Sequence, residues 1–460
     1  MLRCFKSALC DFSPVLFCHQ RTFLQSVLNS DSVMDPAKRK SDVIENENSS
    51  SSEAKKLKIT EDAPIDDIIK KAVETSNRVR KPKKAVILMS YLGKEFYGMQ
   101  RNSNVSTVEE ELLKALLKAN IILQGEFDYP KTMKFQRAAR TDKGVSAVRQ
   151  IVSLKLPLKE INETFAEKVN KCLPAEIRIV AVKRVTQSFD AKIACDARTY
   201  SYMLPTFAFA KDIQDNVEDY RISGECIEDV NAFLKNYIGT HNFYNFTSGR
   251  LAGDPSCKRF IMSCECGPPF ESFGLEFSVI KVKGQSFMLH QIRKMVGLAI
   301  AYMRNLADLN VLQKSWSSDR IDIPKAPGLG LMLEELHYDW YNTKYGSDGM
   351  HQSLTWNEYE EIVNSFKMEK ICANIAKTER EEKSMIQWLE TLPHHSYDVR
   401  EDGPPTTLPT KEEAKDSDSN SSNCNQNSSE NSRLDSNAVY CKDLNSDLKE
   451  SKENEIKCEC

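Results

Sequence analysis

The chain has no stretch of apolar residues long enough to cross a membrane. Its 460 residues are 40% hydrophobic, which is enough for a sizeable core. No window, however, holds the roughly 18 consecutive apolar residues that a spanning helix needs. The 14 cysteines are scattered singly, without a C-x-x-C pair or the Cys/His spacing of structural zinc. We therefore expect a soluble intracellular protein with reduced thiols, no structural metal and no membrane partner.

An overall excess of one charge sign is also missing, because the net charge of −3 hides an uneven distribution. Residues 401–460 contain 14 acidic and 7 basic side chains, so the rest of the chain carries a net charge of +4. This permits a polyanionic partner without demanding one. Residues 396–460 are rich in Ser, Asn, Asp and Glu and poor in large apolar residues, so we expect a disordered acidic tail.

The N-terminal residues have the composition of a targeting segment and not of a folded domain. Residues 1–33 carry basic side chains among Leu, Phe and Ser, with one acid before Asp31. This composition is typical of a mitochondrial presequence or of an ordinary disordered leader.

Residues 34–83 predict a disordered linker. Met34 is a second possible start, and basic clusters follow at 38–40 and 55–58. Such clusters indicate a bipartite nuclear import signal, or a solvated charge run. Alternative starts at Met1 and Met34 would place the protein in mitochondrion and nucleus, with the cytoplasm left open.

Residues 84–395 have the composition of a folded domain. A helix should begin at Thr107, which can form a capping box with Glu110. Strands are expected at 85–89, 133–138, 150–156, 177–185, 197–204 and 275–282; further helices are expected at 158–172, 227–237 and 289–303, and helical material over 342–395. A β-α-β-β-α-β-like order, seen twice, predicts an α/β (α+β) domain with a mixed sheet.

One segment, Arg137–Ala147, combines a single acid with several cations. Asp142 stands among Arg137, Arg140 and Lys143, and a glycine follows that permits positive φ. The cations can hold phosphate oxygens and keep the carboxylate ionised while it faces the sugar. An Asp two residues before a Gly is also a common turn residue. Spacing alone favours the turn.

Two further segments place aromatic and cationic side chains together. Strand alternation sends Arg198, Tyr200 and Tyr202 to one face, where a ring can stack on an unpaired base. The alternative is a half-buried strand. On the expected helix, His290 and Arg293 share one stripe. Arg293 needs an acidic partner such as Asp142 if buried, or it snorkels to water, and His290 alone is more often structural.

The fourth segment is Ala326–Leu331, where two glycines among leucines indicate either a close backbone approach or a tight turn. These four segments, in this order, resemble the tRNA pseudouridine synthase A family, most closely its eukaryotic branch, pseudouridylate synthase 1. The resemblance runs from Val86 to Pro393, about two-thirds of the chain. The ordered set Ala-Arg-Thr-Asp-x-Gly-Val, Ala-Arg-x-Tyr-x-Tyr, His-Gln-Ile-Arg-Lys-Met-Val-Gly and Ala-Pro-Gly-Leu-Gly-Leu is highly specific.

The resemblance implies a fold and a set of roles. The fold would be two ferredoxin-like halves whose strands form one continuous curved sheet, mixed or antiparallel, flanked by helices and with a central basic cleft. Asp142 would be the essential carboxylate and Arg293 would pair with it. Tyr200 would stack on the uracil, and Arg140 would help extrude the nucleotide. Arg198 and His290 would complete the substrate site.

The implied activity is the isomerisation of uridines in tRNA, with mRNA and other structured RNAs left open, by a monomer without cofactor or metal. Three alternatives remain from the residues themselves. The first is a non-catalytic RNA-binding protein on the same scaffold. The second is a glycoside hydrolase, which normally needs two carboxylates where the motifs offer one. The third is a purely structural interaction protein.

Overall fold

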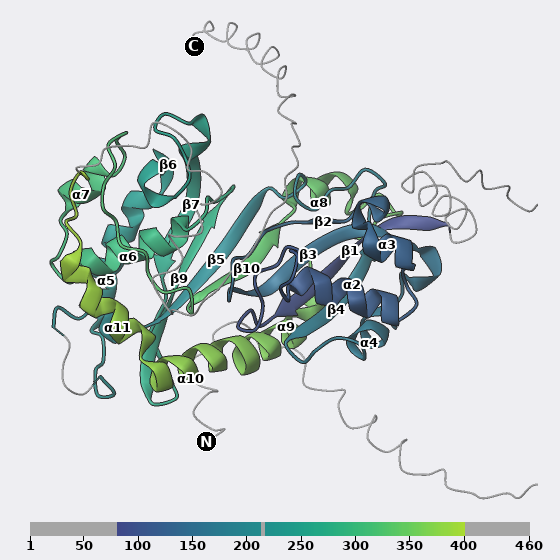
Figure 1. Cartoon of the computed structure of the whole chain (residues 1–460), viewed down its shortest axis with the longest axis horizontal. Helices are drawn as coiled ribbons and strands as arrows, with labels where there is room; N and C mark the ends of the chain where they lie inside the picture. Colours follow the sequence, from purple (N-terminus) through teal and green to yellow (C-terminus); the bar gives the residue numbers. More distant parts are fainter. Residues whose placement is uncertain (1–80, 213–216, 401–460) are drawn as a thin grey trace, which may run out of the picture. The chain divides into compact units, whose positions relative to one another are not determined.

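The computed structural model describes residues 81–212 and 217–400 (Figure 1). The predicted presequence, the basic clusters of the linker and the acidic tail beyond residue 400 lie outside the described residues. Within the described part, no helix is both long and apolar enough to cross a bilayer.

The centre of the fold is a single sheet of ten strands. The strands are β1 (Pro82–Tyr91), β2 (Gln136–Arg137), β3 (Ser146–Pro157), β4 (Ile177–Arg184), β5 (Ala197–Pro205), β6 (Gly239–Asn242), β7 (Lys258–Cys266), β8 (Phe270–Ser272), β9 (Leu275–Gly284) and β10 (Leu331–His337). Eight of them follow the order β4-β1-β3-β10-β5-β9-β7-β6, while β2 pairs with β3 and β8 with β9. Neighbouring strands are antiparallel except β3 and β10, so the sheet is mixed, as predicted.

Two ferredoxin-like halves can be recognised in this order. The first half runs β1, α2 (Val108–Lys118), β2, β3, α4 (Phe165–Asn170), β4, and its strands lie as β4-β1-β3-β2. The second runs β5, α5 (Gly224–Leu234), β7, β9, α6 (Gln291–Met303), β10, and its strands lie as β10-β5-β9-β7. Both halves therefore place the fourth strand beside the first and the third beside the second, which confirms the predicted architecture.

The two halves join at the beginning of β3. Met332 and Leu333 of β10 pair with the first two residues of β3. Further along, the same edge of β3 pairs with β2, where Gln136 lies opposite Ser153. The edge of β3 is thus shared by two strands, and residues 138–145 leave the sheet between them. This split places the Asp142 segment at the junction of the halves.

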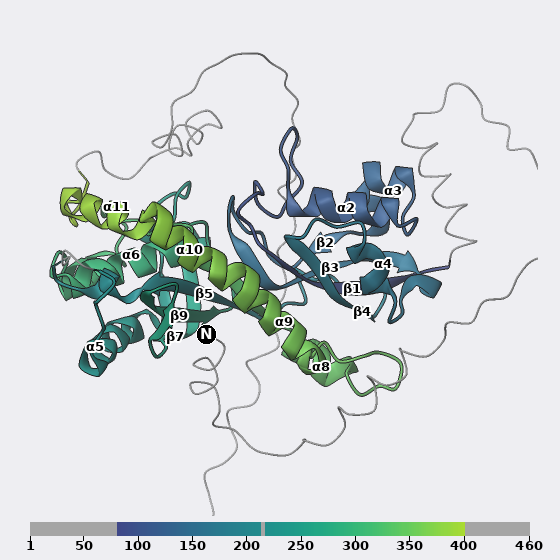
Figure 2. The ribbon, with the colours of Figure 1, turned by 90° about the horizontal axis from the view of Figure 1, so that it is seen from below.

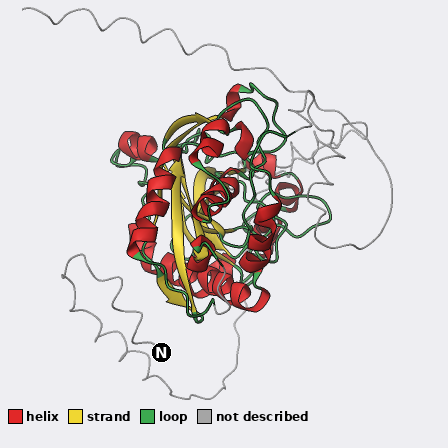
Figure 3. Ribbon diagram, turned by 90° about the vertical axis from the view of Figure 1, so that its left-hand side faces the viewer, coloured by secondary structure: helices red, strands yellow, loops and turns green. Residues whose placement is uncertain are grey.

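A long helical run crosses that junction (Figure 2). It consists of α9 (Glu360–Phe366), a π-helical turn at Lys367–Cys372, α10 (Ala373–Glu382) and α11 (Ser384–Thr391). The shorter helices are α3 (Gln124–Asp128), α7 (Leu309–Lys314) and α8 (Asp339–Tyr345). Seen along the sheet, helices lie on both sides of the strands (Figure 3).

Ion pairs with two buried charges of the sheet, Arg149 and Glu334, attach this run to both halves. Arg149 of β3 donates to Glu360 of α9 at 2.5 Å, and Lys367 pairs with Glu334 of β10 at 2.6 Å. Glu334 also accepts a 2.9 Å bond from Ser201 of β5. The helical run therefore holds β3, β10 and β5 together from outside the sheet.

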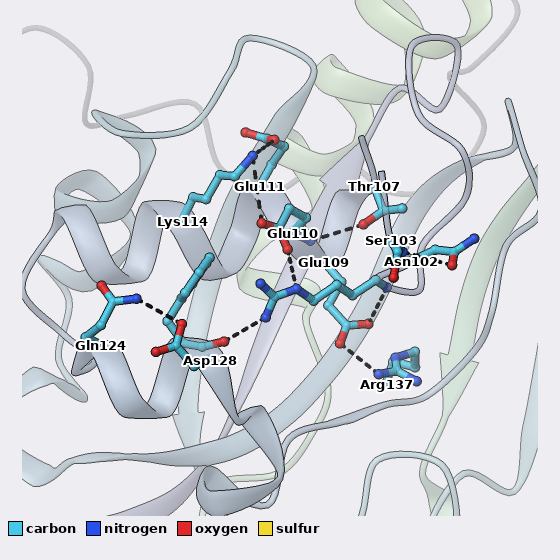
Figure 4. A network of polar contacts seen from close by, with 12 residues as sticks. Asn102, Ser103, Thr107, Glu109, Glu110, Glu111, Lys114, Gln124, Asp128 and Arg137 are labelled. Atoms are coloured by element: carbon cyan, nitrogen blue, oxygen red, sulfur yellow. Dashed lines mark hydrogen bonds and ion pairs between the residues drawn. The ribbon is translucent and has the colours of Figure 1, made fainter. Parts of the chain in front are cut away.

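Only the Thr107 half of the capping box predicted for α2 is present. The Thr107 hydroxyl accepts the backbone N–H of Glu110 at 3.3 Å, as expected of an N-cap. The Glu110 carboxylate pairs with Arg101. The preceding residue, Glu109, is buried and pairs with Arg137 of β2 at 2.8 Å (Figure 4). The first turn of α2 thereby fixes one end of the Asp142 segment.

Two predicted elements were wrong in extent. The helix expected at 158–172 consists of a 3₁₀ turn at Leu158–Glu160 and the α-helix at Phe165–Asn170. Between them, the Asn162 side chain accepts the backbone N–H of Thr164 at 3.0 Å and bends the chain into a turn. The strand expected at 133–138 is reduced to Gln136–Arg137, since Lys134 adopts a left-handed conformation with φ of 52°.

Candidate active site

The Asp142 segment is anchored to β3 by the buried side chain of Gln150. Its amide donates to the Ala139 carbonyl at 3.0 Å and accepts the Ala139 N–H at 3.3 Å. The neighbouring Ala138 N–H donates to the Ile151 carbonyl at 2.9 Å. A single side chain thus substitutes for the missing strand partner and holds the backbone three residues before Asp142.

The other side of the segment is held by Tyr91 of β1. Its phenol and the Thr141 hydroxyl are 2.7 Å apart. Burial raises the pKa of Tyr91 to about 12, so the phenol stays protonated at neutral pH. After Asp142 the chain turns, with Val145 N–H donating to the Asp142 carbonyl and with Gly144 at φ of 78°. The turn presents an exposed Asp142 side chain from a rigid backbone.

Strand β5 supplies Arg198 and Tyr200. The Tyr200 ring is almost fully buried and meets the Phe287 ring edge-on, with 5.3 Å between centroids. Burial raises its pKa well above the ordinary value, while the charge of Arg198 acts in the opposite direction and Asp142 adds to the increase. Arg198 donates to the carbonyl oxygens of Ala138 and Gln285 at 3.1 and 2.8 Å. It thereby links β5 to the Asp142 segment.

Helix α6 brings His290 and Arg293 to the same region. His290 is the N-cap residue, with φ of 63°. Arg293 is half-buried, and its Nε donates to the Ala326 carbonyl at 2.7 Å. The Ala326 N–H returns a 3.1 Å bond to the Arg293 carbonyl. The start of the fourth motif therefore packs directly against the guanidinium.

The close backbone approach predicted for the fourth motif is confirmed at Gly330. A Cβ atom there would lie 2.1 Å from the Met203 carbonyl oxygen of β5, a distance that real atoms do not show. In addition, Met203 N–H donates to the Gly330 carbonyl at 2.9 Å. The Tyr202 hydroxyl donates to Pro327 O at 2.7 Å, so Tyr202 lies beneath this motif rather than in the cavity.

These segments enclose a cavity of about 770 Å³. Of the six predicted site residues, five line it; the sixth, Arg293 of α6, does not. The five are Arg140, Asp142, Arg198, Tyr200 and His290. Six lining residues are arginine or lysine, namely Arg137, Arg140, Lys192, Arg198, Arg250 and Arg259.

Asp142 is the only carboxylate among the described residues that line this cavity. A single acid among cations argues against a glycoside hydrolase, whose chemistry normally needs two carboxylates flanking the bond. In the described ranges, no three His, Cys, Asp or Glu side chains come together as a metal site. The cavity offers a negative oxygen, an aromatic ring and a strongly positive wall, which suits a ribose, a base and phosphates.

A larger hollow of about 1,120 Å³ lies elsewhere, around α5, α7 and residues 396–398. Acidic side chains such as Asp229 and Asp398 alternate there with lysines such as Lys211. It contains none of the six predicted residues, so we do not assign the chemistry to it.

The sequence motifs missed part of the cavity wall. Residues 247–250, Arg259 and Ser286 line it, yet they come from segments without a periodic pattern or a recognised motif. An isolated arginine on a strand gives no signal in a single sequence. Only the pairing of β7 with β9 brings Arg259 to the end of β9, next to Ser286.

A buried lysine lies beside Arg293 and makes stability depend on pH. Lys294 is 8% exposed, and its ammonium donates to the Asn245 carbonyl at 3.0 Å. Burial lowers the pKa of Lys294 from 10.5 to about 7, with further lowering from the nearby Arg320. Between these two pH values the unfolded chain binds up to one more proton than the folded protein. Folding stability should therefore rise with pH in this window, by up to about 1.4 kcal/mol per pH unit.

We expect Lys294→Met to remove this contribution. Urea unfolding at pH 7.5, 8.5 and 9.5 should give a free energy of unfolding whose slope against pH is smaller by about one proton than in the wild type. Lys118→Met, which changes an exposed lysine at the end of α2, is the control. Equal slopes for Lys294→Met and wild type would contradict the lowered pKa.

Residues 233–339 match the sequence profile of the tRNA pseudouridine synthase family. Pseudouridylate synthase 1 homolog of Mus musculus is 51% identical over 321 residues, covering 68% of this chain and 75% of the relative.

Fungal relatives are more distant. The tRNA pseudouridine synthase 1 of Yarrowia lipolytica is 33% identical, over 65% of this chain and 72% of its own. The tRNA pseudouridine(27/28) synthase of Saccharomyces cerevisiae is 32% identical, over 66% of this chain and 98% of its own.

Proposed function

Because the chain belongs to the tRNA pseudouridine synthase family, we propose that it isomerises uridines of tRNA in the cavity around Asp142. The single observation that carries this assignment is the composition of the cavity. Asp142 is the one carboxylate of the described lining, with six cationic side chains and Tyr200 around it. This set matches the needs of a reaction at a ribose carbon of a polyanion.

The reaction needs little from the protein beyond a carboxylate and a holding site. The N1–C1′ bond breaks, the uracil rotates in place, and C5 joins C1′ while C5 loses a proton and N1 gains one. The Asp142 carboxylate can attack C1′ as a nucleophile or remove the C2′ proton as a base. The product is an isomer of the substrate, and no electrons enter or leave.

The other five predicted site residues extrude, position or hold the nucleotide and the carboxylate. A uridine in a folded RNA must leave its stack before Asp142 can reach it. Arg140, exposed beside Asp142, takes the place of the extruded base. Arg293 pairs with Asp142 from α6. Arg198 and His290 complete the wall, and the three-way bonding of Arg198 keeps the Asp142 segment close to β5.

Tyr200 holds the detached uracil by ring contact, so its hydroxyl should matter little. We expect Tyr200→Phe to keep turnover within about threefold of wild type, and Tyr200→Leu to lose about 30-fold or more, in line with the worth of one base–aromatic stack. Single-turnover rates on one tRNA transcript measure both variants. A Tyr200→Phe enzyme as slow as Tyr200→Leu would show instead that the hydroxyl takes part.

The direct test of the proposed function uses purified full-length protein and unmodified tRNA transcripts. Pseudouridine should appear at defined positions, and positions 27 and 28 are the first to inspect because a relative from S. cerevisiae is named for them. Binding of tRNA without any pseudouridine would favour a non-catalytic RNA-binding protein.

We also propose further RNA substrates, a monomeric state and two cellular compartments. We expect other structured RNAs, including mRNA segments, to enter the same cavity, since backbone cations do not read base sequence. The enzyme should act as a monomer, which light scattering during turnover can check. Fusions that start at Met1 and at Met34 should separate mitochondrial from nuclear protein.

A further inference from the structure

The cavity holds two arginines that the proposed mechanism leaves without a role. Arg259 is the second residue of β7, and Arg250 lies in the segment that precedes this strand. Both line the same cavity as Asp142, and neither belongs to any of the four motifs. Their contacts indicate what they are placed to bind.

Arg259 is half-buried and poorly bonded within the described chain. Its Nη1 donates to the Ser286 hydroxyl oxygen at 2.7 Å. Its Nε is buried without a hydrogen-bond partner, and no carboxylate of the described residues lies within ion-pair distance. By contrast, Arg198 has three carbonyl partners. A guanidinium with unmet donors is costly to bury unless something else accepts from it.

The charges around Arg259 and Arg250 leave these two arginines attractive to an anion. The pKa of Arg259 is lowered, first by burial and then by the neighbouring charge of Arg250. The nearest acid is Asp254, which bonds to Arg250 at 3.3 Å in a solvent-exposed pair that contributes little. Of the two arginines, only Arg250 therefore has an acidic partner in the part of the chain that the structure describes.

We propose that Arg259 and Arg250 form a phosphate site that holds the RNA backbone next to the target uridine. The guanidinium fork matches phosphate oxygens in geometry and charge. Because Ser286 accepts from Arg259, its own hydroxyl proton can donate to the same phosphate. The inference rests on the proposed function: a uridine that reaches Asp142 brings its flanking phosphates into the same cavity.

The first test measures salt dependence. Single-turnover reactions on a tRNA transcript give the half-saturating enzyme concentration and the maximal rate for wild type and Arg259→Met. We expect half-saturation to rise about 10-fold near 0.1 M salt, with the maximal rate within about threefold of wild type. The slope of log affinity against log salt should fall by about 0.7 to 0.9, the value for one phosphate contact.

The control is Arg221→Met, which removes an exposed arginine paired with Glu271 outside the cavity. It should leave both the affinity and the salt slope unchanged. Arg259→Lys keeps the charge but loses the fork, so its affinity for the transcript should lie between those of the wild type and Arg259→Met. If Arg259→Met does not fold, Arg259→Lys provides the test in its place.

The second test identifies the phosphate. Methylphosphonate linkages, which are neutral, are placed one at a time on either side of the modified uridine. One of these linkages should weaken RNA binding by the wild type about 10-fold. The same linkage should not weaken RNA binding by Arg259→Met any further, because the linkage and the substitution remove the same contact. An unchanged salt slope in Arg259→Met, or a penalty that persists there at every linkage, would overturn the phosphate site. Absence of pseudouridine with the wild type would instead overturn the proposed function.

Discussion

Replacing Asp142 by asparagine is expected to abolish pseudouridine formation, with a loss of at least about 10⁴-fold in single-turnover rate. The amide has the size of the carboxylate but can neither attack C1′ nor take a proton from C2′. The segment around it is held by Gln150, Tyr91 and the backbone turn to Val145, so the fold does not depend on the carboxylate's charge. The measurement is pseudouridine yield at the mapped position against time.

Binding should respond in the opposite direction. Removal of one negative charge from a wall with six cations strengthens its attraction to a polyanion. Asp142→Asn should therefore bind tRNA at least as tightly as wild type. Asp128→Asn is the control, since Asp128 is an exposed acid on α3 that accepts a bond from Gln124. Product near wild-type levels from Asp142→Asn would remove Asp142 from the chemistry.

The sequence predicted those parts of the site that are encoded locally. Asp142 lies in a turn because Gly144, two residues later in the chain, permits positive φ. Arg198 and Tyr200 share a wall because strand alternation places them on one face. The resemblance carried by these motifs is confirmed by the 51% identical relative. In each case a short pattern fixes the arrangement.

The rest of the cavity wall depends on pairing between strands that are far apart in the sequence, which no short pattern reveals. Arg259 reaches the cavity because β7 pairs with β9 and Ser286 follows β9 directly. Gln150 appeared only as a strand residue, although its amide replaces a strand partner for Ala139. The helix predicted over 158–172 is interrupted by the side-chain bond of Asn162, a local competition that apolar periodicity does not detect.

The junction of the halves explains why the site is where it is. Asp142 comes from the first half, and Tyr200 and Arg293 come from the second. The direct strand pairing between the halves involves only Met332 and Leu333 against the start of β3. Such a short contact leaves the edge of β3 open, and the Asp142 segment occupies the opening. Neither half alone holds both the carboxylate and the ring.

The second large effect is expected at Arg293, which we propose to pair with Asp142. Its guanidinium is held in place by the Ala326 carbonyl, and a Cβ on Gly328 would lie 3.7 Å from its central carbon. This packing fixes the position of the guanidinium. A cation held there would orient the Asp142 carboxylate, and misplacement of a reacting group by about 1 Å can cost about 10²-fold in rate. We therefore expect Arg293→Ala to lower the single-turnover rate by about 10²-fold or more.

Affinity for tRNA should change by less than about threefold in Arg293→Ala, since Arg293 is not among the residues that line the cavity. Arg293→Lys should recover part of the rate, because it restores the charge but not the fork that bonds Ala326. Added guanidinium ion should partly rescue Arg293→Ala and leave Arg293→Lys unchanged. A role limited to packing predicts a lower melting temperature without chemical rescue. Turnover equal to wild type in Arg293→Ala would exclude the residue from the mechanism.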